Sequence, residues 1–439
     1  MVHPMELDRS KRRGKYFMTN EEGGNNCTDE HQCDGTAALI TRLIEPLVLE
    51  LPDNILCDIF SRLPLKSIFY CSCVCKTFLR LVKDPCFIEL HRARSSILTT
   101  NLVFQQRLGR LDTRRLFTFN HEEPPLSFCT CDDQSKYYCC HHGLYTWNIS
   151  VFTFNTRRHV LVGSCNGLLC LYFDSSPKPF YAICNPIRRE QIELPYLAIS
   201  APFHSCANHS GFGICPKTKQ YKVISLMCLT SIDPVTSEES KSLVADVHTL
   251  GSDSWRRIEN APWPKHKSFD PLLNGAVHWI TNSCKPCELI SSFDLAAEAF
   301  KFVPPPAHFS LQYMDRTSRI NIGVLKNCLC ICYIYEDTVF EAWLMKEYGV
   351  QESWTRQFSF DTKFYAELSY QDLRLQRPIK FLNNGDLWFI SREEQLVSFS
   401  PTKRTFKKLR PMGPTKSEFI VHDLSFISPK DVVGANAQN

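Results

Sequence analysis

The sequence lacks a marked excess of charge of either sign. Fifty Lys and Arg residues stand against 46 Asp and Glu residues, which leaves a formal net charge of only +4. A domain that binds nucleic acid or an anionic membrane surface usually carries a larger positive excess. We therefore expect neither nucleic acid nor a membrane among the partners of this chain.

Long apolar segments are missing as well. No apolar run approaches the roughly 18 residues of a membrane-spanning helix, and the polar N-terminus lacks the apolar core of a secretory signal. The 22 cysteines are therefore expected to be free thiols in a reducing compartment, the nucleus, the cytoplasm or both. Cys328, Cys330 and Cys332 alternate with apolar residues, which puts all three on one face of a strand and indicates packing.

Recognisable catalytic motifs are also lacking. The sequence has no phosphate-binding glycine loop, no nucleotide motif and no recognisable pair of carboxylates. His278 lies beside Trp279 in an apolar run, but no motif places a nucleophile or an acidic partner around it. We expect His278 to face a neighbouring part of the fold, and we expect no cofactor and no intrinsic catalysis.

Two cysteine groups could in principle hold a metal. Zinc takes four thiolate or imidazole ligands, and one patch offers Cys129, Cys131, Cys139, Cys140, His141 and His142. Adjacent Cys-Cys-His-His residues do not have the spacing of a zinc finger, so we expect no metal, although zinc at 129–142 stays open. The Cys-x-x-Cys pair Cys284 and Cys287 has no second pair nearby and is interpreted as a loop with two thiols.

The chain ends are predicted to carry little structure. Residues 1–45 are rich in Gly, Asn, Glu and Lys without an apolar period, which predicts a disordered tail. A basic cluster at 10–15 fits a solvated tail better than a nuclear import signal. Residues 426–439 are expected to form a flexible C-terminal tail. The hydrophobic fraction of 44% over 439 residues predicts a substantial core between these ends.

A helical segment begins near Leu51. Pro52 suits a first helical turn, Asp53 lies near the positive end of the helix dipole, and Pro64 ends the helix. Leu65 to Val82 then fits one or two further short helices. A bundle of roughly forty residues has a marginal core, so we expect it to depend on a partner. The apolar stripe of the first helix comprises Leu51, Ile55, Leu56, Ile59, Phe60 and Leu63.

The stretch LPDNILCDIFSRLPLKSIFYCSCVCKTFLRLVKDPCFIELH resembles the F-box, a three-helix module that binds a Skp-type adaptor and joins a substrate receptor to a cullin-RING ubiquitin ligase. The resemblance covers two Leu-Pro pairs, a Val-Cys-Lys segment and a closing Asp84-Pro85. Phe78 stands where plant members usually have Trp. Spacing alone would also fit the core of a small helical domain. The resemblance implies an F-box over 46–92 whose adaptor contacts are Leu51, Pro52, Ile55, Ile59, Leu63, Pro64, Leu65, Val74, Cys75, Lys76 and Phe78.

After Arg94 the pattern changes to short apolar runs divided by turn residues, which predicts an all-β region. Similar turns precede strands at 166–167, 274–275, 326–327 and 384–385. Their spacing fits a repeat of about 54 residues if a further unit lies around Lys219 to Leu226. A second hairpin follows each turn, and in four cases its second strand opens with an aromatic residue, namely Trp255, Phe300, Trp354 and Phe406.

Four antiparallel strands per repeat are typical of a kelch-like propeller blade, and we expect five or six blades with one core aromatic in each. The stretches GSCNGLLCLYF, NPIRREQIELP, LNGAVHWI and LVSFSPTKRTFKKL resemble the F-box-associated interaction domain of plant F-box proteins, which is related to kelch propellers. The resemblance implies this domain at 161–425, after a linker and an uncertain first blade at 93–160.

The expected fold is therefore an α+β multidomain chain, a three-helix F-box followed by an all-β propeller. The resemblance implies a substrate-recognition subunit that reaches cullin and RING subunits through the Skp-type adaptor and carries a target protein on its propeller. A propeller enzyme, such as a metal-assisted oxidoreductase or hydrolase with a helical appendage, is the alternative.

Polar loop residues of the propeller could contact the target. In a turn-rich protein such residues are more often solvated, so we assign no substrate-binding residue. The sequence does not indicate the identity of the target, the signal that licenses its capture or the pathway. The polar loop residues considered are Arg188, Arg189, Asp253, Arg256 and Glu352.

Overall fold

The computed structural model divides into two units, Met1–Pro52 and Asp53–Asn439, and the fold described below is that of the second. The expected disordered tail at 1–45 and the cysteine and histidine patch at 129–142 lie outside the described residues. Among the described residues, no helix is both long and apolar enough to cross a bilayer. The structure describes residues 51–98, 101–108, 113–120, 151–153, 159–173, 179–197, 205–232, 237–265, 272–309, 320–335, 339–361, 375–382, 385–391, 396–409 and 417–436.

Four helices open the second unit. Asp53 provides an acidic residue in the first turn of α2, and Pro64 has the extended backbone (φ −58°, ψ 145°) of an N-cap for α3, so the predicted break at Pro64 is confirmed. The Asp84 carboxylate accepts hydrogen bonds from the backbone N–H groups of Cys86 (2.8 Å) and Phe87 (3.1 Å), which caps α5. The helices are α2 (Asp53–Phe60), α3 (Leu65–Ser72), α4 (Lys76–Lys83) and α5 (Pro85–Leu98).

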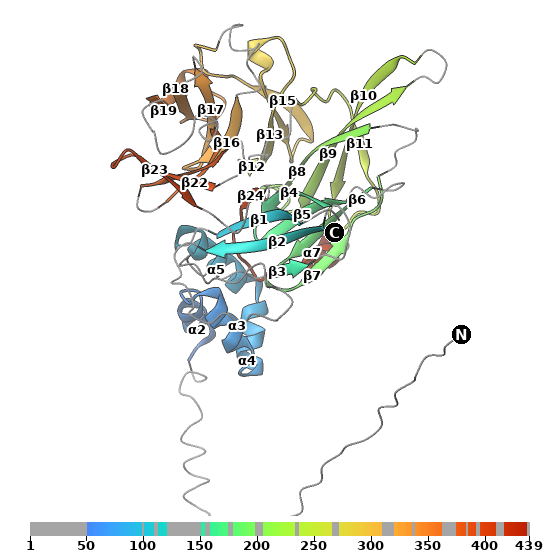
Figure 1. The fold of residues 1–439 in the computed structure, drawn as a ribbon. Coiled ribbons are helices and arrows are strands. Elements are labelled where there is room, and N and C mark those ends of the chain that lie inside the picture. The colour runs from blue at the N-terminus through green and yellow to red at the C-terminus, as the bar shows by residue number, and fades with distance from the viewer. Residues whose placement is uncertain are drawn as a thin grey trace, which may run out of the picture. The chain divides into compact units, whose positions relative to one another are not determined.

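The rest of the described chain contains six four-stranded antiparallel sheets (Figure 1). Blade 1 consists of β24 (Ser417–Val421), β1 (Asn101–Leu108), β2 (Thr113–Asn120) and β3 (Val151–Thr153). Blade 2 consists of β4 (His159–Cys165), β5 (Leu168–Phe173), β6 (Phe180–Asn185) and β7 (Glu190–Glu193). Blade 3 consists of β8 (Ser205–Ile214), β9 (Tyr221–Ile232), β10 (Glu239–Thr249) and β11 (Arg256–Ile258).

The last three sheets have the same order. Blade 4 consists of β12 (Leu272–Leu273), β13 (Ala276–Ile280), β14 (Ile290–Asp294) and β15 (Ala299–Val303). Blade 5 consists of β16 (Asn321–Leu325), β17 (Cys328–Tyr335), β18 (Val339–Met345) and β19 (Trp354–Asp361). Blade 6 consists of β20 (Leu375–Phe381), β21 (Leu387–Ser391), β22 (Leu396–Ser400) and β23 (Thr405–Leu409).

The repeated turns join the first and second strands of the blades. Asn166 and Gly167 have φ values of 50° and 82°, the left-handed pair that a tight hairpin turn requires. Asn274 and Gly275 repeat this geometry in blade 4 with φ values of 52° and 72°. Lys219, with a φ of 59°, precedes β9, so the unit predicted around Lys219 to Leu226 is confirmed as blade 3.

Contacts between neighbouring sheets close them into a ring. In each blade the first or second strand touches the next blade, through the pairs β24 with β4, β4 with β8, β8 with β13, β13 with β16, β16 with β20, and β20 with β24. The ring is closed because β24, from the end of the chain, pairs with β1 from its beginning. The fold is thus a β-propeller, and its six described blades agree with one of the two expected numbers.

The aromatic residues that open the outer strands join one blade to the next. Trp255 of blade 3 donates a hydrogen bond from Nε1 to the Pro195 carbonyl that follows blade 2 (2.7 Å). Trp354 of blade 5 donates in the same way to the Pro304 carbonyl that follows blade 4 (2.9 Å). Both rings also pack on apolar clusters between blades, as expected for one core aromatic in each blade.

The alternating cysteines of β17 pack as predicted. Cys330 and Cys332 are buried in the cluster between blades 5 and 6, and Cys328 packs against that cluster. Burial raises the pKa of the Cys330 thiol well above its usual range, which keeps the thiol protonated. These cysteines therefore contribute to packing.

The C-terminal residues differ from the prediction. The flexible tail expected from 426 onward is wrong for 426–436, because Phe426 is only 5% exposed and helix α7 (Pro429–Asn436) packs on β6 and β7. Ile427, Val432 and Val433 contact the apolar cluster of blades 2 and 3. Three apolar residues in a short polar segment are a weak sequence signal, and their burial depends on a surface formed by distant strands.

Candidate functional site

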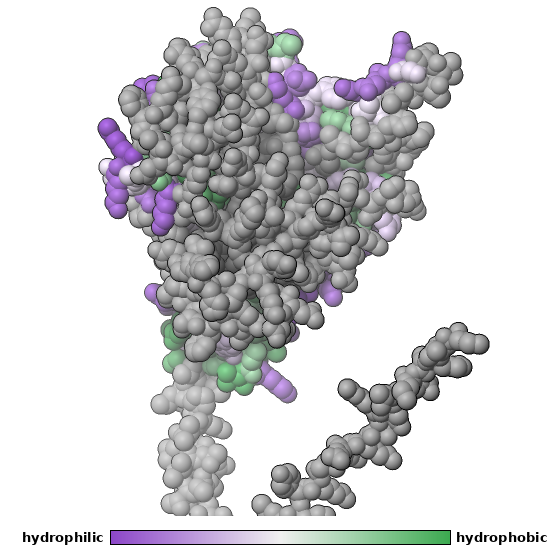
Figure 2. All heavy atoms as spheres, viewed as in Figure 1, coloured by the Kyte–Doolittle hydropathy of each residue, from purple (hydrophilic) through white to green (hydrophobic). Residues whose placement is uncertain are grey.

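The helical bundle at 53–98 exposes an unusual amount of apolar side chain. Of the eleven large hydrophobic residues that are exposed in the described part of the chain, six lie on this bundle. Figure 2 shows hydrophobic side chains gathered over α2, α3 and α4. We call this set the apolar surface of the bundle: Ile55, Ile59, Phe69, Tyr70, Val74 and Leu79.

Helix α2 divides its apolar residues between the bundle core and this surface. Leu56 and Phe60 are 1% and 3% exposed, whereas Ile55 and Ile59 are 43% and 41% exposed. Residues four apart lie on one helix face, so each pair forms its own stripe. The single stripe expected from the sequence is therefore two neighbouring stripes, and only one of them is needed for the core.

Helix α3 and the segment after it continue the surface. Ile68 is fully buried, while Phe69 and Tyr70 are exposed with ring centroids 6.3 Å apart. Val74, between α3 and α4, is 73% exposed. Burial of such exposed apolar side chains against a partner would be favourable, because it removes apolar surface from water.

The residues carried over from the F-box resemblance fall into different environments. Phe78 is buried, with its ring 4.7 Å from that of Phe60, and it belongs to the bundle core. Leu51, Leu63 and Cys75 are half-buried, and Leu65 begins α3. The exposed members are Pro52, Ile55, Ile59, Pro64, Val74 and Lys76.

Sequence reasoning missed three residues of the apolar surface, Phe69, Tyr70 and Leu79. Ile68, Phe69 and Tyr70 are consecutive, and a short helix can bury only part of such a run in a small bundle. That excess was the available signal. Leu79 follows the buried Phe78, and nothing in the local sequence distinguishes the two.

Partly exposed polar contacts also hold α2 against α5. Asp58 pairs with Arg94 (2.7 Å) and with Arg62 (3.1 Å). Hydrogen bonds from Arg62 and then Arg94 lower the pKa of the Asp58 carboxyl. Arg94 also donates to the Asp58 carbonyl (3.1 Å). The long side chain of Arg94 thus ties the last helix of the bundle to the first.

His278 faces a neighbouring blade, as predicted. Its side chain is fully buried, and its Nε2 lies 2.6 Å from the Tyr348 hydroxyl of blade 5. The two rings meet edge to face, with centroids 5.6 Å apart. This contact joins blades 4 and 5.

The cysteine pair in blade 4 lies between β13 and β14, where Cys287 belongs to a short 3-10 helix, Pro286–Glu288, and Cys284 precedes it. Cys284 and Cys287 are both exposed free thiols at either end of Lys285 and Pro286. Lys285 pairs with Glu288 (2.9 Å). Within the described ranges, no group of three or more His, Cys, Asp or Glu residues is placed to hold a metal ion.

Two of the five polar loop residues form ion pairs of the fold. Arg188 pairs with Glu190 (2.8 Å). Arg256 pairs with Glu298, which also holds the buried Lys222 (2.6 Å) and so joins blades 3 and 4. The remaining three, Arg189, Asp253 and Glu352, are exposed.

A small helical bundle with an apolar surface is joined to a propeller of six described blades, so the chain combines one helical module with one large β scaffold. Residues 48–90 match the F-box domain, and residues 150–423 match the F-box associated beta propeller domain. Because the second match spans more than half of the sequence, the chain belongs to the family of F-box proteins with an F-box-associated β-propeller. The two modules are those of an F-box substrate receptor, a family that is generally a non-catalytic adaptor.

Relatives with similar sequences come from Arabidopsis thaliana. F-box protein At3g07870 is 28% identical over 415 residues, which cover 85% of this chain and 90% of the relative. F-box protein CPR1 is 28% identical over 386 residues, covering 79% and 83% of the two chains. F-box/kelch-repeat protein At3g23880 is 24% identical over 322 residues, covering 70% and 79%.

Proposed function

We propose that this chain is the substrate-recognition subunit of a Skp-cullin-F-box ubiquitin ligase. The F-box binds a Skp-type adaptor, which connects it to cullin and RING subunits, and the propeller holds a target protein whose ubiquitination the complex promotes. The observation that carries the proposal is the concentration of six exposed apolar residues on the F-box. An F-box without a partner would leave this surface in water.

The energetics favour a protein partner for this surface. Burial of apolar area contributes about 25 cal/mol per Å², so six half-exposed side chains can contribute several kcal/mol of favourable free energy. Exposed aromatic rings such as Phe69 and Tyr70 are typical interface anchors. Lys76, beside this surface, is exposed and suits the polar rim of an interface.

The catalytic contribution of the chain is proximity. A target held on the propeller and a conjugating enzyme held through the adaptor react within one complex, at an effective concentration of up to about millimolar. The propeller suits the holding role because its blades form a stable scaffold for surface loops. In this proposal the chain itself makes and breaks no bond.

A location in the nucleus, the cytoplasm or both is part of the proposal. The support is chemical, because the described cysteines are free thiols, as in a reducing compartment. Fluorescence microscopy of the tagged full-length chain tests this location. A signal confined to the secretory pathway would contradict it.

Co-purification with a Skp-type adaptor tests the ligase role. The native chain should capture the adaptor, and a Leu51→Ala, Pro52→Ala variant should lose it while its propeller stays folded. Phe302→Ala is the matched control, since Phe302 is 49% exposed on the outer strand of blade 4. Equal capture by all three chains, or capture by none, would argue against adaptor binding through the F-box.

A further inference from the structure

The chain leaves the propeller next to the place where it entered. Strand β24 pairs antiparallel with β1, and Val421 lies opposite Leu102. The last helix of the F-box, α5, ends at Leu98, shortly before β1. Residues 422–428, which follow β24, therefore emerge beside α5. We call residues 422–428 the C-terminal strap.

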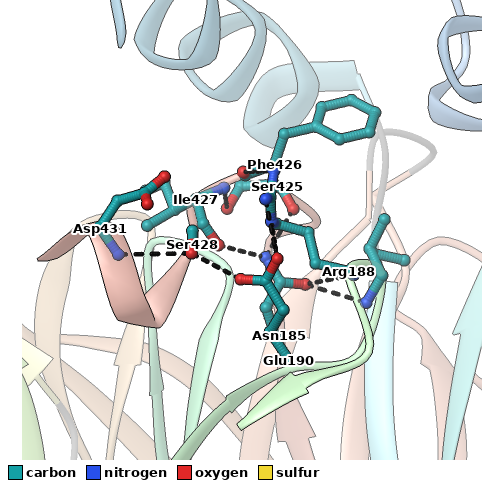
Figure 3. Close-up of polar contacts among 9 residues, drawn as sticks. Asn185, Arg188, Glu190, Ser425, Phe426, Ile427, Ser428 and Asp431 are labelled. Carbon is teal, nitrogen blue, oxygen red and sulfur yellow. Dashed lines mark hydrogen bonds and ion pairs between the residues drawn. The ribbon is translucent and has the colours of Figure 1, made fainter. Parts of the chain in front are cut away.

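Side chains of blade 2 bind the backbone carbonyls of the strap. The fully buried Asn185 donates hydrogen bonds from Nδ2 to the carbonyls of Ser425 (2.9 Å) and Ile427 (2.7 Å) (Figure 3). The Arg188 guanidinium donates to the Phe426 carbonyl (3.3 Å). Three consecutive strap carbonyls are thus bound by Asn185, at the end of β6, and by Arg188, in the turn that follows, which fixes the path of the strap on the blade.

The end of the strap is anchored by charge and by a helix cap. Glu190, already paired with Arg188, accepts a hydrogen bond from the Ser428 hydroxyl (2.5 Å). Ser428 Oγ in turn accepts one from the backbone N–H of Asp431 (3.4 Å) at the start of α7. Figure 3 shows these groups converging between the β6–β7 turn and α7.

The opposite side of the strap faces the F-box. The Phe426 ring lies 6.1 Å from the His91 ring of α5, which also stacks on Phe87 at 6.1 Å. All three side chains are at most 5% exposed. His91 hydrogen-bonds the backbone of Leu63, at the end of the first helical segment. Phe426 thus connects the F-box core to the strap, whose backbone is bound by blade 2.

We infer that Phe426 and His91 are positioning residues, which lock the F-box and the propeller into one body and so fix where a bound target lies relative to the ligase. The consequence for the ligase rests on the proposed function, whereas the rigid connection between the F-box and the propeller does not. The chain joins α5 to β1 directly, and a single covalent connection would allow rotation about itself. The strap supplies a second, non-covalent connection from the other end of the chain.

The two contacts of the strap have different consequences. The polar anchors of Asn185 and Arg188 hold the strap to the blade, so their loss would free the strap and α7 together. The Phe426 ring contacts α5, so its truncation should leave the strap on the blade and loosen the F-box, which keeps the weaker electrostatic contacts of Arg92 with Tyr221 and Asp423. Phe426→Ala therefore separates positioning from folding.

A distance measurement in the full-length chain tests the inference without a known target. The 22 native cysteines preclude thiol labelling. The exposed residues Lys83 of the F-box and Asp253 of blade 3 are therefore replaced by noncanonical amino acids that carry spin labels. Pulsed electron paramagnetic resonance should give one narrow distribution of the distance between the two labels in the native chain. Phe426→Ala should broaden it, Phe426→Leu should restore most of the narrow peak, and the matched Phe302→Ala control should leave it unchanged.

Two further readouts separate the possible failures. Skp-type adaptor binding should be unchanged in Phe426→Ala, and the propeller should still unfold in one cooperative transition, although loss of the buried ring lowers its melting temperature. A distribution as narrow in Phe426→Ala as in the native chain would overturn the inference. If the alanine variant does not fold, Phe426→Val, which also removes the ring, is measured in its place, and a distribution as narrow as that of the native chain would overturn the inference in the same way. Loss of adaptor binding in the native chain would instead contradict the proposed function, and leave the distance result valid.

Discussion

Ile55 and Leu56 are neighbours on α2, yet their side chains face different surroundings. Leu56 is 1% exposed and packs in the F-box core, whereas Ile55 is 43% exposed on the apolar surface. Both are branched apolar residues of similar size, so their different environments separate stability from binding. Substitutions at the two positions should therefore have different effects.

Leu56→Ala should destabilise the F-box and Ile55→Ala should not. Loss of a buried leucine leaves a cavity and costs about 2–5 kcal/mol of unfolding free energy. A surface substitution usually changes it by less than about 0.5 kcal/mol. Hydrogen exchange of the α2 to α5 amides measures local stability directly, and equal loss of protection in both variants would show that Ile55 belongs to the core.

Gly167 and Gly349 form a matched pair for testing the strap. Both have positive φ values, 82° and 86°, so alanine at either position should cost about 1–2 kcal/mol of backbone strain. A Cβ on Gly167 would also lie 2.5 Å from the Ser425 Cβ, whereas one on Gly349 meets nothing within 4 Å. Thermal melting should show the larger loss for Gly167→Ala, and equal losses would contradict the close seating of the strap.

The stability of the propeller should fall as the pH drops below about 6.5. Burial lowers the pKa of His422 from 6.5 to about 3, while its Nδ1 lies 2.9 Å from the Ser164 hydroxyl. Between these pH values the unfolded chain binds a proton that the folded chain does not, so stability decreases with falling pH by up to about 1.4 kcal/mol per pH unit.

His422→Asn isolates this contribution, because it keeps a polar group near Ser164 without titrating. Burial also lowers the pKa of His91 and His248, so part of the pH dependence should remain in the variant. Urea unfolding at several pH values measures the slope between about pH 6.5 and 3. A variant with the native slope would show that His422 is protonated in the folded state.

Local signals in the sequence predicted the blades well. Asn-Gly pairs carry their own turn geometry, so the turns at 166–167 and 274–275 were recognisable without tertiary information. Trp255 and Trp354 were placed in the core because an aromatic residue at a fixed position in each repeat must be buried against the next blade. The break at Pro64 follows from the chemistry of proline.

Contacts between distant segments were not predictable. Leu102 and Val421 pair across almost the whole chain, and neither segment carries a signal for the other. The burial of Phe426 depends on His91 and on the turn that holds Asn185, which the fold alone brings together. For the same reason, spacing identified an apolar stripe in the F-box but did not show that Leu56 faces inward and Ile55 outward.

The affinity of the purified chain for a Skp-type adaptor, measured by titration calorimetry, tests the central claim most directly. An Ile55→Asp, Ile59→Asp variant places two carboxylates on the apolar surface, where burial of a charge without a partner is unfavourable. We expect the native chain and the Phe302→Asp control to bind equally, and the double variant to bind at least about tenfold more weakly, a difference of about 1.4 kcal/mol. Equal affinity of all three chains, with the double variant folded, would contradict docking through this surface.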